Sequence, residues 1–237
     1  MPALAEQTVV ITGAAQGLGA AIARVFAGQG ARLVLMDLDA EGLAAVKAAT
    51  GGRTETLTVD LADAEATADA IAAIRGPVGT LIHNAAILRP EPLEQVSLAT
   101  FRATMDVGIQ AGFQLSQGVW SGMKAQGGGA LIFVSSQSGI KGFADETAYC
   151  AAKHALEGFS KCLALEGAAH GILSCTITPG KAMHTPMSEA NYPPELKAEW
   201  IDPARLAPAF AHIATARDMA LSGQRLNSWD LSQEHPL

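Results

Sequence analysis

Tyr149 and Lys153 are two side chains whose types and spacing suit acid–base chemistry. Residues four apart on a helix lie one above the other on the same face, so a helix here would place the phenol beside the ammonium. A free phenol has a pKa of about 10, and a nearby ammonium lowers that pKa because it favours the phenolate. The pair could therefore exchange a proton with a substrate oxygen near neutral pH. The alternative is a half-buried tyrosine beside a solvated lysine.

A glycine-rich turn near the start of the chain has the composition of a phosphate-binding loop. A β-branched run at 8–11 predicts a buried parallel strand, and it leads directly into the turn, residues 12–19. A helical pattern over 20–29 and a second strand over 32–36 follow. Glycines let a backbone approach a pyrophosphate closely, and a helix N-terminus offers it free N–H groups. An ordinary turn is the alternative for a glycine cluster alone. The predicted dinucleotide contacts in the turn are Gly13, Gln16, Gly17, Leu18 and Gly19.

Asp37 ends the second predicted strand and indicates which dinucleotide the turn holds. It lies 24 residues after the first glycine, at position 13, close to the spacing of the carboxylate that binds the adenosine ribose hydroxyls. A carboxylate there repels a 2′-phosphate, Asp39 adds to the repulsion, and no Arg or Lys stands at 14–16 or 38. We therefore predict NAD in preference to NADP. The alternative is that Asp37 only caps the helix that follows it.

Strand and helix patterns alternate along the whole chain, which predicts an α/β fold. We expect a single Rossmann-like domain over 1–237, built as one doubly wound parallel sheet with helices on both faces. The further strands are expected at 54–59, 79–83, 130–134, 173–177 and 224–226, the further helices at 41–49, 64–74, 97–124, 149–169 and 207–220, and a tail at 227–237.

Residues 181–208 break this alternation because five prolines punctuate them. The segment follows the carboxyl end of a predicted strand, which is where doubly wound sheets bind ligands. Its methionines, tyrosine and tryptophan suggest a lid over a partly apolar substrate pocket. A plain surface excursion is the alternative.

Composition excludes several classes of function. The formal net charge is -7 over 237 residues, which argues against a nucleic-acid partner. No apolar run reaches the roughly 18 residues of a membrane span, and no signal peptide is visible at the N-terminus. Three widely spaced cysteines indicate reduced thiols in a cytoplasmic protein, with neither a disulfide frame nor a metal site.

Taken in order and spacing, these motifs resemble those of the short-chain dehydrogenase/reductase family over about residues 8–226. The family's Thr-Gly-x-x-x-Gly-x-Gly turn is similar to residues 12–19, and its Tyr-x-x-x-Lys pair to Tyr149 and Lys153. Its catalytic serine lies 13 residues before the tyrosine, which selects Ser136 over Ser135. The other cofactor contacts that the resemblance implies are Asp60, Leu61, Asn84, Ala85, Pro179, Gly180 and Thr185.

The resemblance implies an NAD-dependent oxidoreductase that interconverts a secondary alcohol and a ketone by hydride transfer. Lys153 would bind the nicotinamide ribose and lower the Tyr149 pKa, Tyr149 would exchange the proton, and Ser136 would hydrogen-bond the substrate oxygen. Thr185 would reach the nicotinamide amide. For Ser136 and Thr185 the alternatives are a strand-end serine and an ordinary turn residue.

The chain departs from the family pattern at several positions. Gly108 stands where the family has a catalytic asparagine that helps connect the lysine to solvent, so the proton relay lacks that side chain. His83 precedes Asn84 and is interpreted as a structural histidine. Lys141, Asp145 and Glu146 lie before the catalytic helix, where solvated charges are expected.

Gly108 also motivates an alternative function, a catalytically impaired dinucleotide-binding or regulatory protein on the same fold. A third hypothesis, an interaction protein without nucleotide, fits poorly with the intact glycine turn. The expected partners are a small-molecule alcohol or carbonyl compound and a second copy of the chain, because family members are usually homodimers or homotetramers. No nucleic acid or membrane partner is expected.

Overall fold

The computed structural model describes residues 3–236 and contains one seven-stranded sheet with the order β3-β2-β1-β4-β5-β6-β7. Every adjacent pair is parallel. This confirms the predicted doubly wound α/β fold. The strands are β1 Thr8–Thr12, β2 Arg32–Asp37, β3 Thr54–Thr58, β4 Val78–His83, β5 Gly129–Val134, β6 Ile172–Thr178 and β7 Arg225–Asn227. The helices are α1 Gly17–Gly28, α2 Ala40–Thr50, α3 Ala64–Ala72, α4 Leu98–Met105, α5 Ala111–Ala125, α6 Thr147–Gly167, α7 Pro186–Asn191, α8 Ala207–Ala216 and α9 Ser228–Glu234.

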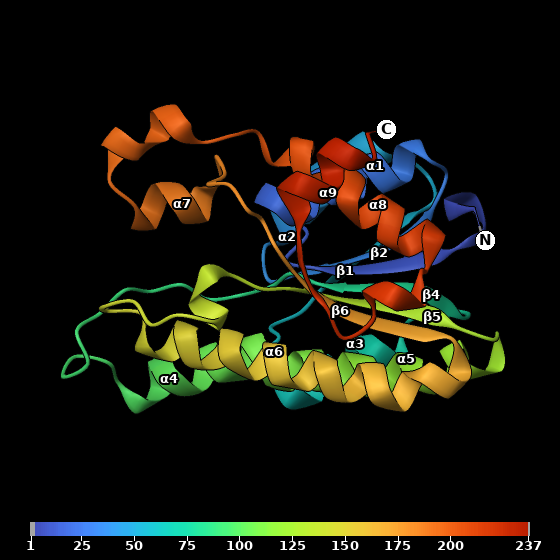
Figure 1. The fold of residues 1–237 in the computed structure, drawn as a ribbon, viewed down its shortest axis with the longest axis horizontal. Helices are drawn as coiled ribbons and strands as arrows, with labels where there is room; N and C mark the ends of the chain where they lie inside the picture. Colours follow the sequence, from blue (N-terminus) through green and yellow to red (C-terminus); the bar gives the residue numbers. More distant parts are fainter. Residues whose placement is uncertain (1–2, 237) are drawn as a thin grey trace.

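Two helical layers cover the sheet, with α1, α2, α8 and α9 on one face and α3, α4, α5 and α6 on the other (Figure 1). Successive side chains of a strand point to opposite faces. Along β1, Val9 and Ile11 therefore pack with Phe26 of α1 in one apolar core, whereas Val10 packs with Leu115 of α5 in the other. The strands are buried on both faces, which is why they read as continuous apolar runs.

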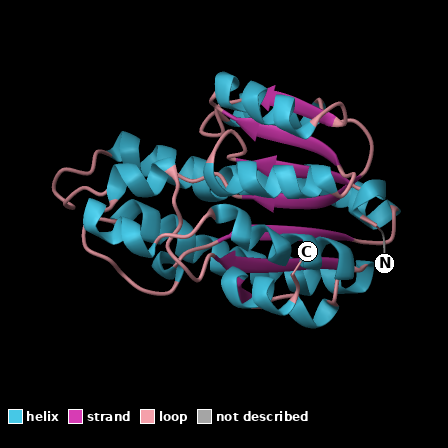
Figure 2. Ribbon diagram, turned by 90° about the horizontal axis from the view of Figure 1, so that it is seen from above, coloured by secondary structure: helices cyan, strands magenta, loops and turns pink. Residues whose placement is uncertain are grey.

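All strand arrowheads point to the same end of the sheet, toward α7 (Figure 2). The chain winds outward in both directions from the neighbouring strands β1 and β4. Doubly wound sheets bind their ligands in the crevice outside this switch point. The fold thus brings the glycine turn after β1 and the segments after β4, β5 and β6 to one edge.

The long helix expected at 97–124 is two helices joined by a π-helical turn, Asp106–Gln110. In this turn the Ala111 N–H donates to the Asp106 carbonyl, five residues back. Single π-helical turns inside longer helices are frequent at functional sites. Nothing in the helical period of the sequence distinguishes such a turn from continuous helix.

Residues 181–208 fold back on themselves. Backbone hydrogen bonds join His184 N to Ile201 O at 2.9 Å and Ile201 N to Ala182 O at 2.9 Å, which closes the base of the excursion. Only its first part, up to Tyr192, lines the cavity described below. No helix of residues 3–236 is long and apolar enough to cross a membrane.

The prediction that 227–237 is a tail was wrong, because residues 228–234 form α9. The Asn227 side chain caps this helix by accepting hydrogen bonds from the Trp229 and Asp230 backbone N–H groups. Ser228 and Ser232 are buried and donate to the Leu206 carbonyl at 2.9 and 3.1 Å. Only two apolar side chains of α9, Trp229 and Leu231, pack against the core, which is too few to show a helical period in the sequence.

We expect Asn227→Ala to lower the free energy of unfolding by about 1 kcal/mol, because the first N–H groups of α9 lose their acceptor. Asn227→Asp keeps an acceptor at the same place and should retain most of that stability. Urea unfolding of the two variants and the wild type provides the comparison. Equal stability of all three proteins would show that the cap contributes nothing.

Candidate active site

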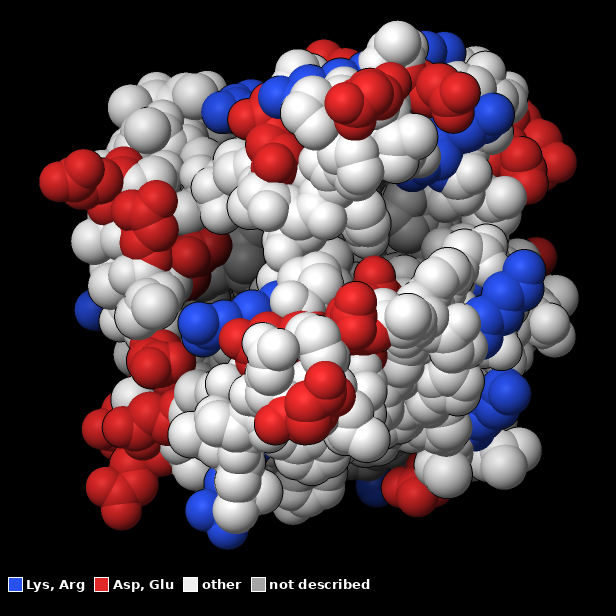
Figure 3. Space-filling view, turned by 90° about the vertical axis from the view of Figure 1, so that its left-hand side faces the viewer, with Lys and Arg blue, Asp and Glu red and all other residues white. Residues whose placement is uncertain are grey.

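A cavity of about 640 Å³ opens over the carboxyl ends of the strands. Figure 3 shows this face hollowed between the two layers, with acidic side chains bordering the hollow. With one exception, the residues predicted to bind a cofactor or substrate line this one cavity. They are Gly13, Gln16, Gly17, Leu18, Asp37, Asp60, Leu61, Asn84, Ala85, Ser136, Tyr149, Lys153, Pro179, Gly180 and Thr185.

The exception is Gly19, which is not a lining residue. A Cβ at this position would lie 2.2 Å from the Gly13 carbonyl oxygen. Gly19 therefore permits α1 to pack directly against the turn, and it shapes the cavity without contacting a ligand in it.

The glycine turn has the backbone that a pyrophosphate cradle requires. Gly13 and Gly17 have φ values of 62° and 54°, in the left-handed region that favours glycine. A Cβ at Gly13 would lie 2.9 Å from the Ala85 Cα, so a side chain would collide with the loop after β4. The Asn84 amide donates to the carbonyls of Thr12 and Gly13 at 3.1 and 3.0 Å and locks the two loops together. The residues present therefore fit a dinucleotide at this turn.

Asp37 lies at the end of β2 and faces the cavity. One carboxylate oxygen accepts from the Ala15 N–H at 3.0 Å and the other from the Asp39 N–H at 3.1 Å. The residue that caps α2 is Asp39, whose side chain accepts from the Gly42 N–H. The alternative interpretation of Asp37 as a helix cap was therefore wrong.

Ser136, Tyr149 and Lys153 lie together on the cavity wall. Lys153 is 2% exposed. Its Nζ donates a hydrogen bond to the Val134 carbonyl at 2.6 Å and lies 5.5 Å from the centre of the Tyr149 ring. Burial lowers the pKa of Lys153 to about 8, and the Glu157 carboxylate partly opposes this lowering. The ammonium therefore remains mostly protonated at pH 7.

The pKa of Tyr149 differs from the prediction that Lys153 depresses it. Burial raises this pKa above its usual value, a hydrogen bond with Ser136 lowers it in part, and the Glu146 carboxylate contributes to the rise. Desolvation of the phenolate is thus the largest influence on this pKa. The amount of burial depends on the tertiary structure, which a helical spacing cannot indicate.

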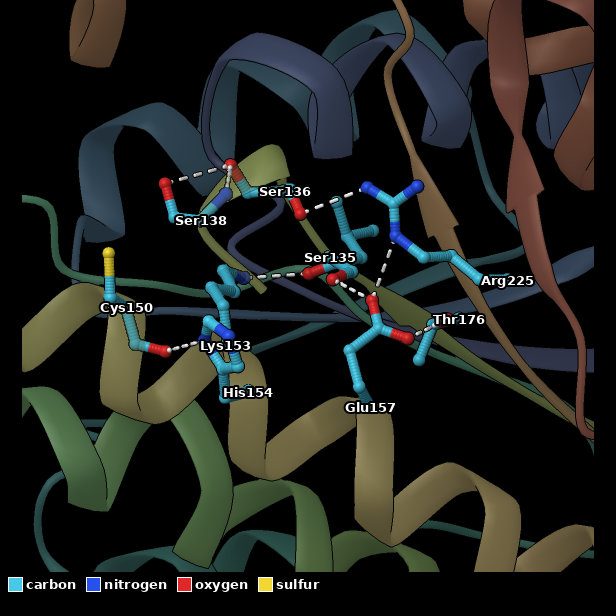
Figure 4. A network of polar contacts seen from close by, with 10 residues as sticks. Ser135, Ser136, Ser138, Cys150, Lys153, His154, Glu157, Thr176 and Arg225 are labelled. Carbon is cyan, nitrogen blue, oxygen red and sulfur yellow. Dashed lines mark hydrogen bonds and ion pairs between the residues drawn. The ribbon is translucent and has the colours of Figure 1, made fainter. Parts of the chain in front are cut away.

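An ionic network centred on the buried Glu157 lies behind the candidate catalytic residues (Figure 4). Glu157, one turn after Lys153 on α6, accepts hydrogen bonds from Ser135, from Thr176 at 2.7 Å and from Arg225 at 3.2 Å. Arg225 also donates to the Ser136 carbonyl at 3.1 Å. The roles of Glu157 and Arg225 cannot be inferred from the sequence, because no local motif connects residues 68 positions apart.

His83 is buried at the end of β4 and binds the π-helical turn. Its Nδ1 pairs with the Thr12 hydroxyl at 3.0 Å, and its Nε2 lies 3.1 and 3.2 Å from the carbonyls of Val107 and Gly108. Burial lowers the pKa of His83 to about 4, and the charge of Lys153 adds to the lowering. His83 is therefore a neutral structural histidine, as predicted, and its Nε2–H is the donor to the turn.

The substrate end of the cavity contains residues that the sequence analysis left as loops or solvated charges. Lys141 and Asp145 are exposed as expected, but Glu146 is 9% exposed and lines the cavity. Thr185 lines it too, although its hydroxyl also caps α7 by accepting from the Ser188 N–H at 3.1 Å. Further lining residues of this end are Leu88, Gln137, Ser138, Phe143, Met183, Met187 and Tyr192, and Leu38 lines the cavity beside Asp37.

Comparison with known proteins gives concordant matches. A family model described as short chain dehydrogenase matches residues 7–195. D-threitol dehydrogenase of Mycolicibacterium smegmatis is 37% identical over 179 residues, which cover 73% of this chain and 69% of that protein. L-xylulose reductase of Bos taurus is 34% identical over 197 residues, which cover 83% of this chain and 80% of that protein.

Solved structures share the fold. A Beutenbergia cavernae protein assigned as an NAD(P)-dependent gluconate 5-dehydrogenase, with NADP bound at low occupancy, superposes with a TM-score of 0.87. It is 29% identical, and the match covers 96% of this chain and 98% of that one. A 3-ketoacyl-(acyl-carrier-protein) reductase of Brucella melitensis, complexed with NADH, has a TM-score of 0.86 over 93% and 96% of the two chains. Its identity of 24% supports the fold alone.

The low pKa of His83 predicts a specific pH dependence of stability. The folded protein releases the His83 proton at about pH 4, whereas an unfolded histidine releases it near 6.5. Above pH 6.5 His83 is neutral in both the folded and the unfolded state, and its contribution to the free energy of unfolding is fully present. As the pH falls toward 4, the unfolded state binds a proton that the folded state does not, so this contribution is lost. In His83→Gln, which keeps a donor and an acceptor, the free energy of unfolding should fall less between pH 7 and pH 5 than in the wild type. Urea unfolding at both pH values measures this, and parallel losses would contradict it.

Proposed function

The chain belongs to the short chain dehydrogenase family, and on that premise we propose that it is an NAD(H)-dependent oxidoreductase that interconverts a secondary alcohol and a ketone. The observation that carries this proposal is the continuity of the cavity. It reaches from Asp37 past the glycine turn to Ser136, Tyr149 and Lys153. A dinucleotide bound along it would have its adenosine end near Asp37 and its reactive end near Tyr149.

Each catalytic residue has one role in the proposed reaction. A bound nicotinamide supplies the hydride acceptor for an alcohol or the hydride donor for a ketone. Tyr149 exchanges the proton with the substrate oxygen, and Ser136 donates a hydrogen bond to that oxygen as charge develops on it. Protonated Lys153, held by the Val134 carbonyl, would bind the nicotinamide ribose and places its charge 5.5 Å from the centre of the Tyr149 ring.

The preference for NAD is supported by the adenosine end of the cavity. Asp37 would repel a 2′-phosphate, and the residues lining the cavity beside it, Leu38, Asp60 and Leu61, carry no positive charge. Named relatives act on polyols and sugars, as D-threitol dehydrogenase and L-xylulose reductase do by their names. These names agree with a small alcohol or carbonyl substrate.

The alternative, a catalytically impaired dinucleotide-binding protein, rests on Gly108. We retain it as the outcome that absence of turnover would favour. Homodimer or homotetramer formation is also proposed, supported by the exposed Leu98, Phe113 and Leu165 on α4, α5 and α6. A cytoplasmic location is proposed because Cys150, Cys162 and Cys175 are free thiols.

Binding of NAD and NADP, measured by calorimetry, tests the role of Asp37. We expect NADP to bind about tenfold more weakly or worse, because like charges would be brought together. Asp37→Ser should bring the dissociation constants of NAD and NADP closer together. Asp69→Asn removes an exposed charge outside the cavity and should leave the ratio of the two dissociation constants unchanged. Equal or tighter binding of NADP would contradict the proposed cofactor preference.

Turnover by Tyr149→Phe tests the catalytic assignment. We expect kcat to fall about 10²- to 10⁴-fold on any alcohol that the wild type oxidises, since the variant cannot exchange the proton. NAD binding by the variant should persist, which separates loss of chemistry from loss of the site. Full turnover by Tyr149→Phe would overturn the assignment.

A further inference from the structure

Glu146 places a carboxylate in the substrate end of the cavity. In the described part of the chain, the cavity has two other carboxylate residues, Asp37 and Asp60, and both follow strands on the opposite side of the switch point. Glu146 instead lies directly before α6, three residues before Tyr149. Glu146 is the N-cap of α6 and lines the same cavity as Tyr149. A substrate held at the Tyr149 hydroxyl therefore occupies a cavity that Glu146 also lines.

The backbone before Glu146 is held in an unusual conformation. Asp145 has a φ of 63°, in the left-handed region that costs a non-glycine residue about 1 kcal/mol or more. The Glu91 N–H donates to the Asp145 carbonyl at 2.8 Å and fixes this geometry. Strain of this kind persists where the surroundings over-determine it, and it concentrates at functional sites.

The Glu146 side chain does not satisfy its own helix. Residues at a helix N-terminus often accept hydrogen bonds from the first N–H groups, but Glu146 makes no such bond to α6. Its Oε2 accepts from the Ser138 hydroxyl at 2.7 Å. Its Oε1 accepts no hydrogen bond from any of residues 3–236. Glu146 is 9% exposed, and it lines the cavity.

The residues around Glu146 Oε1 suit a hydrogen-bond donor that a ligand supplies. Leu88, Phe143, Met183 and Met187 give this end of the cavity an apolar lining. This oxygen is not fully buried, so a ligand in the cavity can reach it and donate a hydrogen bond to it. Burial raises the pKa of Tyr192, another lining residue, and the Glu146 charge adds to the rise.

We propose that Glu146 binds a hydrogen-bond donor on the carbon next to the reacting carbinol carbon, so that the preferred substrates are vicinal diols or 1,2-amino alcohols rather than simple alcohols. This inference rests on the proposed function and specifies its substrate class. A hydroxyl and an ammonium share the required chemistry, because each donates to a carboxylate. A substrate with a carboxylate at this position is repelled.

Three alcohols of nearly equal size test the proposal. Butan-2-ol, propane-1,2-diol and 1-aminopropan-2-ol differ only in a terminal methyl, hydroxyl or ammonium group beside the carbinol carbon. With NAD, the wild type should oxidise propane-1,2-diol or 1-aminopropan-2-ol, or both, with a kcat/KM about 10- to 100-fold above that for butan-2-ol. The larger of the two values identifies which donor the site takes.

Glu146→Gln tests whether the carboxylate is responsible. The ratio of kcat/KM for the preferred donor substrate to kcat/KM for butan-2-ol should fall about tenfold or more in this variant. Glu94→Gln changes an exposed residue outside the cavity and should keep the wild-type ratio. If Glu146 serves only to hold Ser138, the variant loses activity on all three alcohols alike and the ratio is unchanged. An unchanged ratio, or equal wild-type values for the three alcohols, overturns the proposal.

A binding measurement separates this inference from the proposed function. Saturation-transfer NMR on the wild type with NAD present ranks the three alcohols without turnover. Preferential binding of a donor that Glu146→Gln abolishes, with no turnover of any alcohol, supports the Glu146 site and contradicts the proposed oxidoreductase activity. Absence of any preference in binding overturns the Glu146 site even if the alcohols are turned over.

Discussion

The buried carboxylate of Glu157 holds together the elements that carry the candidate catalytic residues. It joins α6, which bears Tyr149 and Lys153, to the end of β5 through Ser135, to β6 through Thr176 and to β7 through Arg225. Removing a partner would leave the buried Glu157 charge without compensation, which is costly. The distances among the candidate catalytic residues therefore depend on an interaction that lies behind the cavity wall.

This arrangement explains why the last strand and the C-terminal helix matter to a site formed mainly by the centre of the chain. Arg225 on β7 reaches the Ser136 carbonyl, and the Asn227 side chain lies against Gly180, where a Cβ would be 1.9 Å from its Oδ1. The position of Asn227 is set in turn by α9, which it caps. Packing at the end of the chain is thus transmitted to the cavity wall through two polar side chains.

The sequence allowed the fold and most of the cavity to be predicted, and physical reasons separate the successes from the failures. β5 is buried on both faces, so its apolar run is a direct signal, and the glycine turn is required by close backbone approach at Gly13. Glu146, Glu157 and Arg225 acquire their roles only from tertiary neighbours. The pKa of Tyr149 could not be obtained from helical spacing either, since burial dominates it.

Gly108 shows how a departure from a family pattern can be a structural requirement. A Cβ at this position would lie 2.8 Å from the Cβ of Ala152, the residue before Lys153, so any larger residue would push α6 away. The polar contact to the π-helical turn comes from His83, which β4 supplies. Glycine at 108 lets α6 approach the turn closely, and histidine at 83 fixes the carbonyl groups of Val107 and Gly108.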